Sequence, residues 1–186
     1  METTMKLYEI IKICNEALNL DIPSEYFEER QEESDWRIKT LVNCCNFVCE
    51  ELYRDYATSI RKTVVEVTNG FADTSDYKMC RVLTLTDGEG NDVKFRYTDN
   101  GISVEKDGKY NMRYARLPER LGWNDVVTMP SPRITERIFV YGVAREFYLA
   151  IGDVELAKQW DERFKDALAV ACSKTSPMRM PVRGWL

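Results

Sequence analysis

Histidine is absent from all 186 residues of the sequence. Histidine is the commonest general base, the usual partner of serine and cysteine nucleophiles, and the commonest metal ligand. The sequence also has no Gly-x-Gly-x-x-Gly motif and no phosphate-binding Gly-x-x-x-x-Gly-Lys-Ser/Thr motif. These absences exclude most hydrolytic triads and the common nucleotide sites. We therefore expect a protein without catalytic residues, cofactor or metal.

Long apolar runs are absent too, and none approaches the roughly 20 residues that span a bilayer. The first residues lack the charged and apolar regions of a signal peptide. A net charge of −5 disfavours general adhesion to DNA or to anionic membranes. With 44% hydrophobic and 31% charged residues, the chain has the composition of a globular protein. We expect a protein without a membrane partner, made and folded in the cytoplasm.

Six cysteines are present, but they do not have the paired Cys-x-x-Cys spacing of zinc sites. Four of them fall at core-facing positions of predicted helices. Buried structural thiols are therefore favoured over metal or redox chemistry. The cysteines are Cys14, Cys44, Cys45, Cys49, Cys80 and Cys172.

Hydrophobic periodicity divides the chain into helical and β sections. Apolar residues recur at helical spacing over residues 4–19 and again from a predicted N-cap at Ser34 to about residue 56, with a short acidic helical turn at 24–32 between them. At about residue 60 the period changes from 3.6 to 2, and five strands follow at 63–67, 78–86, 93–97, 102–105 and 110–114. Helical spacing resumes over 132–150, where Gly152 ends one helix and Asp153 caps the next.

These elements predict an α+β fold that is mainly helical. It consists of a bundle of about four helices with an inserted antiparallel β-meander and an extended C-terminal tail. The N-terminal helices occupy 1–59, the β section 60–129 and the C-terminal helical hairpin 130–174. The tail occupies 175–186.

Three polar clusters offer weaker signals for chemistry. The residues 87–92 resemble a calcium loop, but they lack the twelve-residue register of an EF-hand and a hairpin turn is favoured. An acidic run (Glu25, Glu28, Glu29, Glu32, Glu33, Asp35) fits a solvated face better than a catalytic carboxylate pair. Lys94 and Arg96 with Arg81 form a predicted basic strip, beside which Tyr97, Tyr110 and Tyr114 could stack on bases. An ordinary exposed sheet face whose charges discourage edge pairing is favoured for this strip. A nucleic-acid-binding or regulatory module using this basic β face is the alternative function.

The tail is too apolar for a solubilising end and too proline-broken for a helix. Tryptophan and arginine are enriched at interface hot spots. We therefore predict that the tail binds a partner, most simply a neighbouring subunit, with docking on its own chain as the alternative. The predicted partner-binding residues are Met178, Arg179, Met180, Arg183, Trp185 and Leu186.

The segment from Ile134 to Leu168 resembles a block in phage head–tail adaptor (connector or neck) proteins. In that family an apolar Tyr-Gly-x-Ala helix and a glycine turn precede a helix with an alanine three residues before a tryptophan. Here Tyr141-Gly142-Val143-Ala144 is followed by Gly152 and then by Ala157 and Trp160. The match covers about a fifth of the chain, and the order of elements elsewhere is similar.

The resemblance implies a structural virion protein at the head–tail junction of a bacteriophage or prophage, made in the bacterial host cytoplasm. Such adaptors form an oligomeric ring, commonly dodecameric, below the portal protein ring. The ring extends the DNA channel and supports a downstream stopper or tail protein. Carried over to this chain, the resemblance implies that Met178 to Leu186 grip the portal. DNA would pass through the lumen without specific binding.

Overall fold

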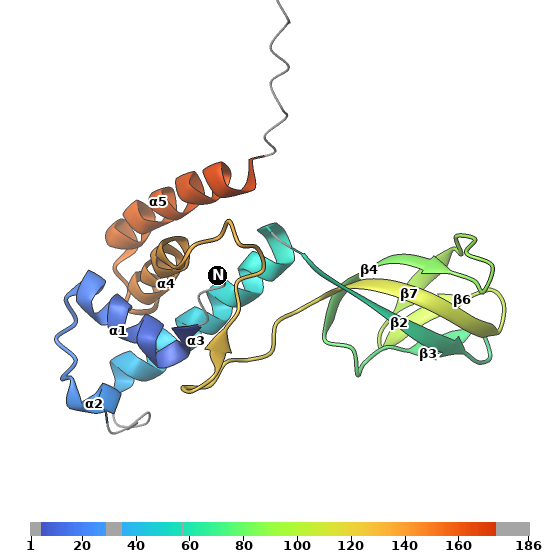
Figure 1. Cartoon of the computed structure of the whole chain (residues 1–186), viewed down its shortest axis with the longest axis horizontal. Helices are drawn as coiled ribbons and strands as arrows, with labels where there is room; N and C mark the ends of the chain where they lie inside the picture. Colours follow the sequence, from blue (N-terminus) through green and yellow to red (C-terminus); the bar gives the residue numbers. More distant parts are fainter. Residues whose placement is uncertain (1–4, 29–34, 57, 174–186) are drawn as a thin grey trace, which may run out of the picture.

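The computed structural model describes residues 5–28, 35–56 and 58–173. They form two bodies, a helical body and a β body, which are joined where the chain enters and leaves the β section (Figure 1). The β body consists of residues 59–116, and the helical body of the other described residues. Each body has its own core of buried apolar residues.

The helical body is built from segments at both ends of the sequence. Its elements are α1 (Leu7–Leu18), α2 (Glu25–Glu28), α3 (Trp36–Glu51) with a π-helical turn (Leu52–Tyr56), α4 (Glu136–Ala150), α5 (Val154–Cys172), and a small sheet of β1 (Met5–Lys6) and β8 (Val126–Val127). The α4 helix lies against α1, α3 and α5. This central position explains why α4 is apolar on most sides, as its sequence predicts.

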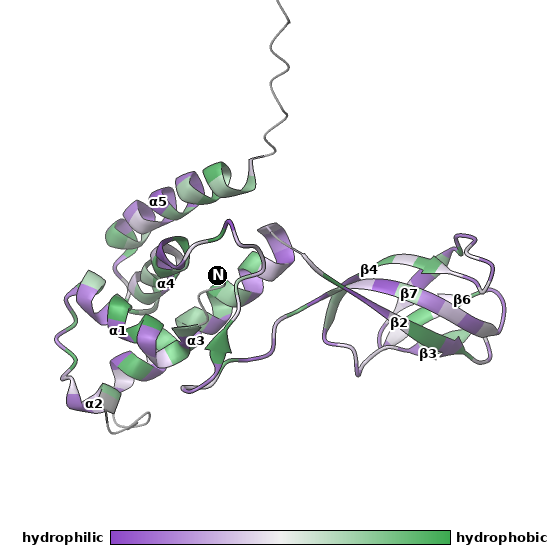
Figure 2. Ribbon diagram, viewed as in Figure 1, coloured by the Kyte–Doolittle hydropathy of each residue, from purple (hydrophilic) through white to green (hydrophobic). Residues whose placement is uncertain are grey.

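The β body contains two antiparallel three-stranded sheets, of order β2-β7-β4 and β3-β6-β5. Along these strands hydrophilic residues alternate with hydrophobic ones (Figure 2), and the inner faces of the two sheets share one core. The strands are β2 (Ser59–Val67), β3 (Phe71–Asp73), β4 (Met79–Thr86), β5 (Phe95–Thr98), β6 (Gly101–Val104) and β7 (Gly108–Arg116).

The predicted mainly helical four-helix bundle with a β-meander is wrong. The described residues have an α+β fold with five helices and about eight strands in three antiparallel sheets, 43% helical and 27% strand. A meander pairs strands that follow one another, whereas β2 pairs with β7 along its whole length, from Ser59 opposite Arg116 to Val67 opposite Gly108. This long-range pairing closes the β section around a core of its own, so the β section is a second body and not a meander.

Tyr97 links the two sheets where β4 has an irregular register against β7, between Val82 and Thr84. Its hydroxyl accepts a hydrogen bond from the Val82 N–H at 2.8 Å and donates one to the Val82 carbonyl at 3.2 Å. Both backbone groups therefore have a partner although the strand is irregular there. The side chain is nevertheless 58% exposed.

Helix termini follow the predictions in part. Asp153 caps α5 as predicted, because its carboxylate accepts a hydrogen bond from the Leu156 N–H at 3.0 Å. The predicted N-cap Ser34 lies outside the described residues, and Asp35 occupies the N-cap position of α3. The chain before α1 pairs with β8 as strand β1 instead of extending the helix.

Candidate functional site

All six predicted partner-binding residues of the tail lie outside the described residues: Met178, Arg179, Met180, Arg183, Trp185 and Leu186. The structure does describe the helix that precedes them. The α5 helix buries Ala157, Phe164 and Leu168 against its neighbours and leaves its other side open. In its last turn Val170 is 77% exposed. The α5 helix thus lies on the outside of the helical body (Figure 1).

Arg145 joins the three helices α3, α4 and α5 at the base of the hairpin. Its guanidinium donates to Glu51 of α3 (3.2 Å from Nη1), to Glu146 of α4 (3.0 Å from Nε) and to Asp161 of α5 (3.4 Å from Nη1). Its side chain is only 11% exposed and lies over the ring of Phe164, 4.9 Å from the ring centroid. Burial disfavours the charged guanidinium, but the carboxylates of Glu51 and Glu146 outweigh it and raise the pKa of Arg145. The cluster places one permanent cation among three carboxylates and thereby ties the hairpin to α3.

Close packing at Gly142 explains the glycine of the adaptor-like block. A Cβ at this position would lie 2.8 Å from Val48 of α3 and 2.9 Å from Phe164 of α5. Only glycine lets α4 approach both helices this closely. Ala144 and Ala157 of the same block are also buried. These residues of the block therefore form the packing of the hairpin.

Four cysteines are buried thiols, as predicted, and lie on α1 and α3: Cys14, Cys44, Cys45 and Cys49. Burial raises the pKa of Cys44 and of Cys49 to about 12. Cys80 and Cys172 are exposed. In the described residues no histidine, cysteine, aspartate and glutamate side chains gather in a way that could hold a metal ion.

The predicted hairpin at residues 87–92 is confirmed. The Asp87 carboxylate accepts hydrogen bonds from the N–H groups of Glu89 and Asn91, both at 2.9 Å, and from the Asn91 amide at 3.0 Å. These bonds lower the pKa of Asp87. The Asp87 carboxylate therefore holds the turn together.

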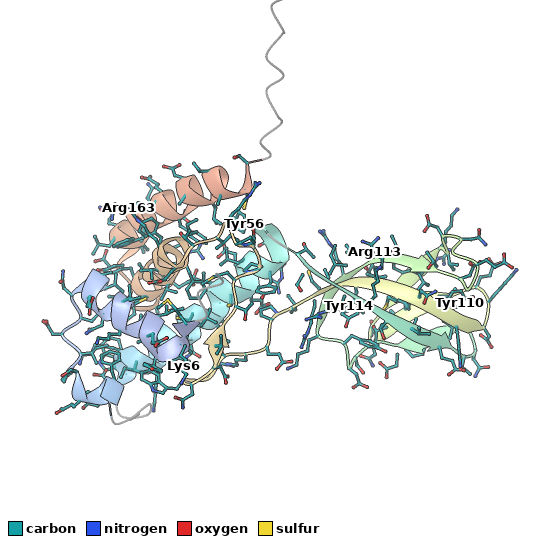
Figure 3. All side chains as sticks on the ribbon, in the orientation of Figure 1. Lys6, Tyr56, Tyr110, Arg113, Tyr114 and Arg163 are labelled. Carbon is teal, nitrogen blue, oxygen red and sulfur yellow. The ribbon has the colours of Figure 1, made fainter. Side chains whose placement is uncertain are left out.

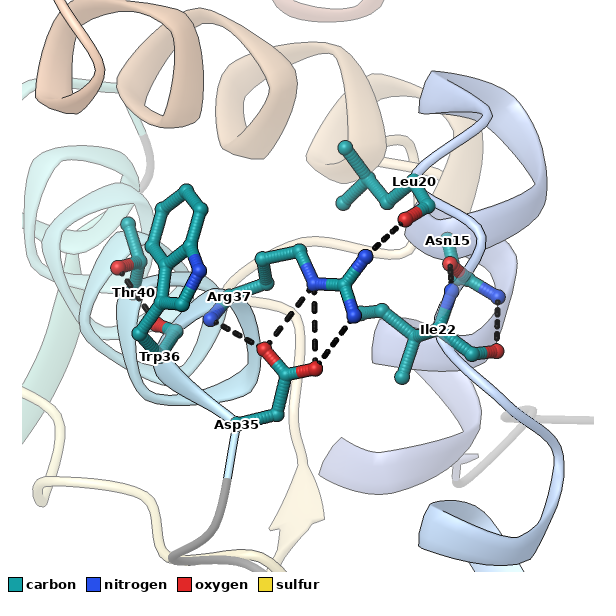
Figure 4. A network of polar contacts seen from close by, with 7 residues as sticks. All are labelled: Asn15, Leu20, Ile22, Asp35, Trp36, Arg37 and Thr40. Atoms are coloured by element: carbon teal, nitrogen blue, oxygen red, sulfur yellow. Dashed lines mark hydrogen bonds and ion pairs between the residues drawn. The ribbon is translucent and has the colours of Figure 1, made fainter.

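The acidic run is described only in part. Glu25 and Glu28 lie on α2, whereas Glu29, Glu32 and Glu33 lie outside the described residues. Asp35 accepts hydrogen bonds from the Arg37 backbone N–H at 2.8 Å and from the Arg37 guanidinium at 3.0 Å (Figure 4). Arg37 also donates to the Leu20 carbonyl. This network ties the segment after α1 to the start of α3.

A groove of about 590 Å³ lies at the junction of the two bodies, between α3 and the loops of the β body. Its wall carries two exposed aromatic side chains, Phe47 of α3 and Tyr97 of β5. Two of its carboxylates, Glu50 and Glu119, are exposed and paired with Arg54 and Arg116. Such pairs have similar solvated environments, whereas an acid–base couple needs carboxylates whose environments differ.

The predicted basic strip does not form one surface. Arg81 pairs with Ala115 on the outer face of the β2-β7-β4 sheet, whereas Arg96 pairs with Ser103 on the outer face of the other sheet. Tyr110 and Tyr114 are 7% and 8% exposed and belong to the core between the sheets (Figure 3). They cannot stack on bases, and Tyr97 is the exposed member of the predicted trio.

A different basic group emerges from the register of the β2-β7 pair. Lys62 of β2 lies directly opposite Arg113 of β7, and both are exposed. Neither forms an ion pair with any of the residues that the structure describes. The sequence gives no sign of this pair, because the two residues belong to strands whose pairing cannot be read from local turns.

No protein-family model matches the chain, and no curated protein is significantly similar to it. Among the described residues no helix combines the length and the apolar character needed to cross a membrane.

Proposed function

We propose that this chain is a non-catalytic structural virion protein, a head-to-tail adaptor subunit. Its copies form a ring below the portal, extend the DNA channel and support the attachment of a stopper or tail protein. The proposal rests on the resemblance of the Ile134–Leu168 segment to phage adaptors and on the chemistry of the tail.

The observation that carries the proposal is the position of α5. This helix packs mainly on α4, on the outside of the helical body, and ends next to the exposed Val170. The hairpin is held by the Arg145 cluster and by the close approach at Gly142. The hairpin therefore ends at the surface with α5, and the sequence that follows Ser173 contains the apolar, arginine-containing segment that we propose to bind a partner.

The alternative function, a nucleic-acid-binding module on the basic β face, has less support. Its predicted cations are divided between two outer faces, and two of its three tyrosines are core residues. Sequence-tolerant binding to single strands combines a positively charged groove with aromatic side chains that stack on bases.

Co-sedimentation of the purified protein with the portal ring of the same genome tests the proposal. We expect stoichiometric binding that is lost when Arg179, Arg183 and Trp185 are all replaced by alanine. The matched control replaces Lys158, Arg163 and Trp160 of α5 by alanine, which likewise removes two cations and a tryptophan, but from a described helix. No binding to an intact portal ring, or equal loss in both variants, would contradict the proposal.

A deletion of residues 178–186 separates partner binding from folding. We expect the shortened chain to keep its urea unfolding midpoint and to lose portal binding, because the tail contributes interface and not core. A large drop in the midpoint would show instead that the tail packs on its own chain.

A further inference from the structure

We propose that the outer face of the β2-β7-β4 sheet is a subunit–subunit contact that receives the acidic helical body of a second copy of this chain. The inference rests on the proposed ring and names one of its contacts. We define the basic face by five residues of this sheet: Ile60, Lys62, Val64, Arg81 and Arg113.

These five residues share one side of the sheet. Val65, Met112 and Val82 are buried, and each directly adjoins a residue of the basic face along β2, β7 and β4. Because successive side chains of a strand point to opposite faces, the residues of the basic face point away from the core. Arg113 lies on this part of the β body in Figure 3.

The arrangement of cations on the basic face lowers the stability of the isolated subunit. Lys62 and Arg113 are direct cross-strand neighbours, and like charges in this position destabilise a sheet. Arg81 of β4 lies on the same face, because it pairs with Ala115 of β7, which pairs with Ile60 of β2. None of the three cations is ion-paired within the described part of the chain. An arrangement that costs stability in one copy is expected where a second molecule neutralises it.

Apolar side chains on the same face favour a protein over DNA as the occupant. Ile60 is 48% exposed and Val64 is 57% exposed, and both lie in β2 on either side of Lys62. Aliphatic groups between cations can be buried against another protein, whereas they have no favourable contact with phosphates. The five residues include no aromatic ring that could stack on a base.

Charge complementarity identifies the occupant as another copy. The β body carries 10 lysines and arginines against 9 aspartates and glutamates, a net charge of +1. The described residues of the helical body carry 12 against 18, a net charge of −6. A basic face of one subunit that meets the acidic body of the next is a heterologous contact, the kind that closes into a ring.

Photo-crosslinking of the full-length protein tests the contact. A benzoylphenylalanine replaces Val64, and crosslinked products are mapped by mass spectrometry with and without the portal ring. We expect crosslinks to described residues of the helical body of a second copy. In the double variant Lys62→Glu, Arg113→Glu the yield of this crosslinked product should fall at least ten-fold.

The matched control reverses the same charge on the other outer face, in Lys94→Glu, Arg96→Glu, and should keep the crosslink. Equal loss in the two variants, no crosslink between copies in either condition, or crosslinks to DNA or to the portal instead would overturn the inference. Portal co-sedimentation of the benzoylphenylalanine-substituted protein with Lys62 and Arg113 unchanged separates the two proposals. Portal binding without the Val64 crosslink means that this inference fails and the adaptor function stands.

A stability measurement distinguishes a contact surface from a merely structural role. Lys62→Glu alone turns a like-charge pair into an opposite-charge pair, so it should raise the urea midpoint while it weakens the crosslink. If Lys62 instead stabilised the fold, its replacement would lower the urea midpoint. That result would overturn the claim that the Lys62–Arg113 pair destabilises the isolated subunit.

Discussion

Arg145 of α4 and Glu51 at the end of α3 form an ion pair, although 93 residues separate them along the chain. The pair connects the two parts of the sequence that build the helical body. The same guanidinium also pairs with Glu146 and with Asp161 of α5. One side chain thus connects the N-terminal helices, which precede the β body, to the C-terminal hairpin, which follows it. The contact makes the helical body one unit although the β body interrupts it in sequence.

Replacement of Arg145 by alanine should destabilise the protein by about 2–4 kcal/mol. The change leaves three carboxylates close together with no cation between them. The carboxylates are partly exposed, and solvent screening therefore keeps the loss below that of a fully buried pair. Chemical denaturation in urea measures the loss.

The control is Arg54→Ala, which removes the exposed pair between Arg54 and Glu50. Exposed pairs of this i, i+4 kind contribute only about 0.5 kcal/mol or less. Similar losses in the two variants would contradict the connecting role of Arg145.

Gly142→Ala should also destabilise the protein, by about 1–2 kcal/mol. Alanine is the better helix former by about 1 kcal/mol, but the new methyl group would press against Val48 and Phe164. The neighbours are core side chains and must shift. Gly88→Ala is the control, because no atom lies within 4 Å of a Cβ there. A Gly142→Ala protein as stable as wild type would show that the three helices have room to separate.

Helix positions could be predicted from this sequence because helical periodicity is a local property. The stripe that begins with Leu7 and the cap at Asp153 both correspond to observed features. Strand pairing is not local, since Lys62 meets Arg113 only when β2 and β7 align across the whole β section. Tight turns favour pairing between neighbours and therefore led to the incorrect meander.

Burial was likewise predicted correctly for candidate residues on a helix and incorrectly for two on a strand. Burial of Cys45 and Cys49 follows from their positions on the inner side of an amphipathic helix, and the structure confirms it. Tyr110 and Tyr114 were expected to be available for stacking, but alternation along β7 places them in the core. The face that a strand residue occupies depends on which side the second sheet covers, and the sequence of one strand does not contain that information.

In a thiol titration two cysteines should react rapidly in the native protein, and all six should react after unfolding. Cys80 and Cys172 are exposed, whereas the other four are buried and burial raises their pKa, so that they carry almost no thiolate at neutral pH. Ellman's reagent at pH 8 measures both phases. The Cys80→Ser, Cys172→Ser variant should have no fast phase. Fast reaction of a third thiol in the wild type would contradict the packing of α1 against α3.

The N-cap carboxylate Asp35 should make stability depend on pH below about 4. The hydrogen bonds from Arg37 lower the pKa of Asp35 in the folded protein. A carboxyl group with a lowered folded pKa stabilises the protein above its unfolded pKa, and this stabilisation is lost as the pH falls through the folded value. Asp35→Asn keeps a capping oxygen but removes the charge. The difference in urea midpoint between wild type and Asp35→Asn should therefore be present at pH 6 and shrink toward pH 2.5, and a constant difference would rule out the ion pair as its source. Asp35→Ala, which also removes the cap, should cost about 1–2 kcal/mol at pH 6.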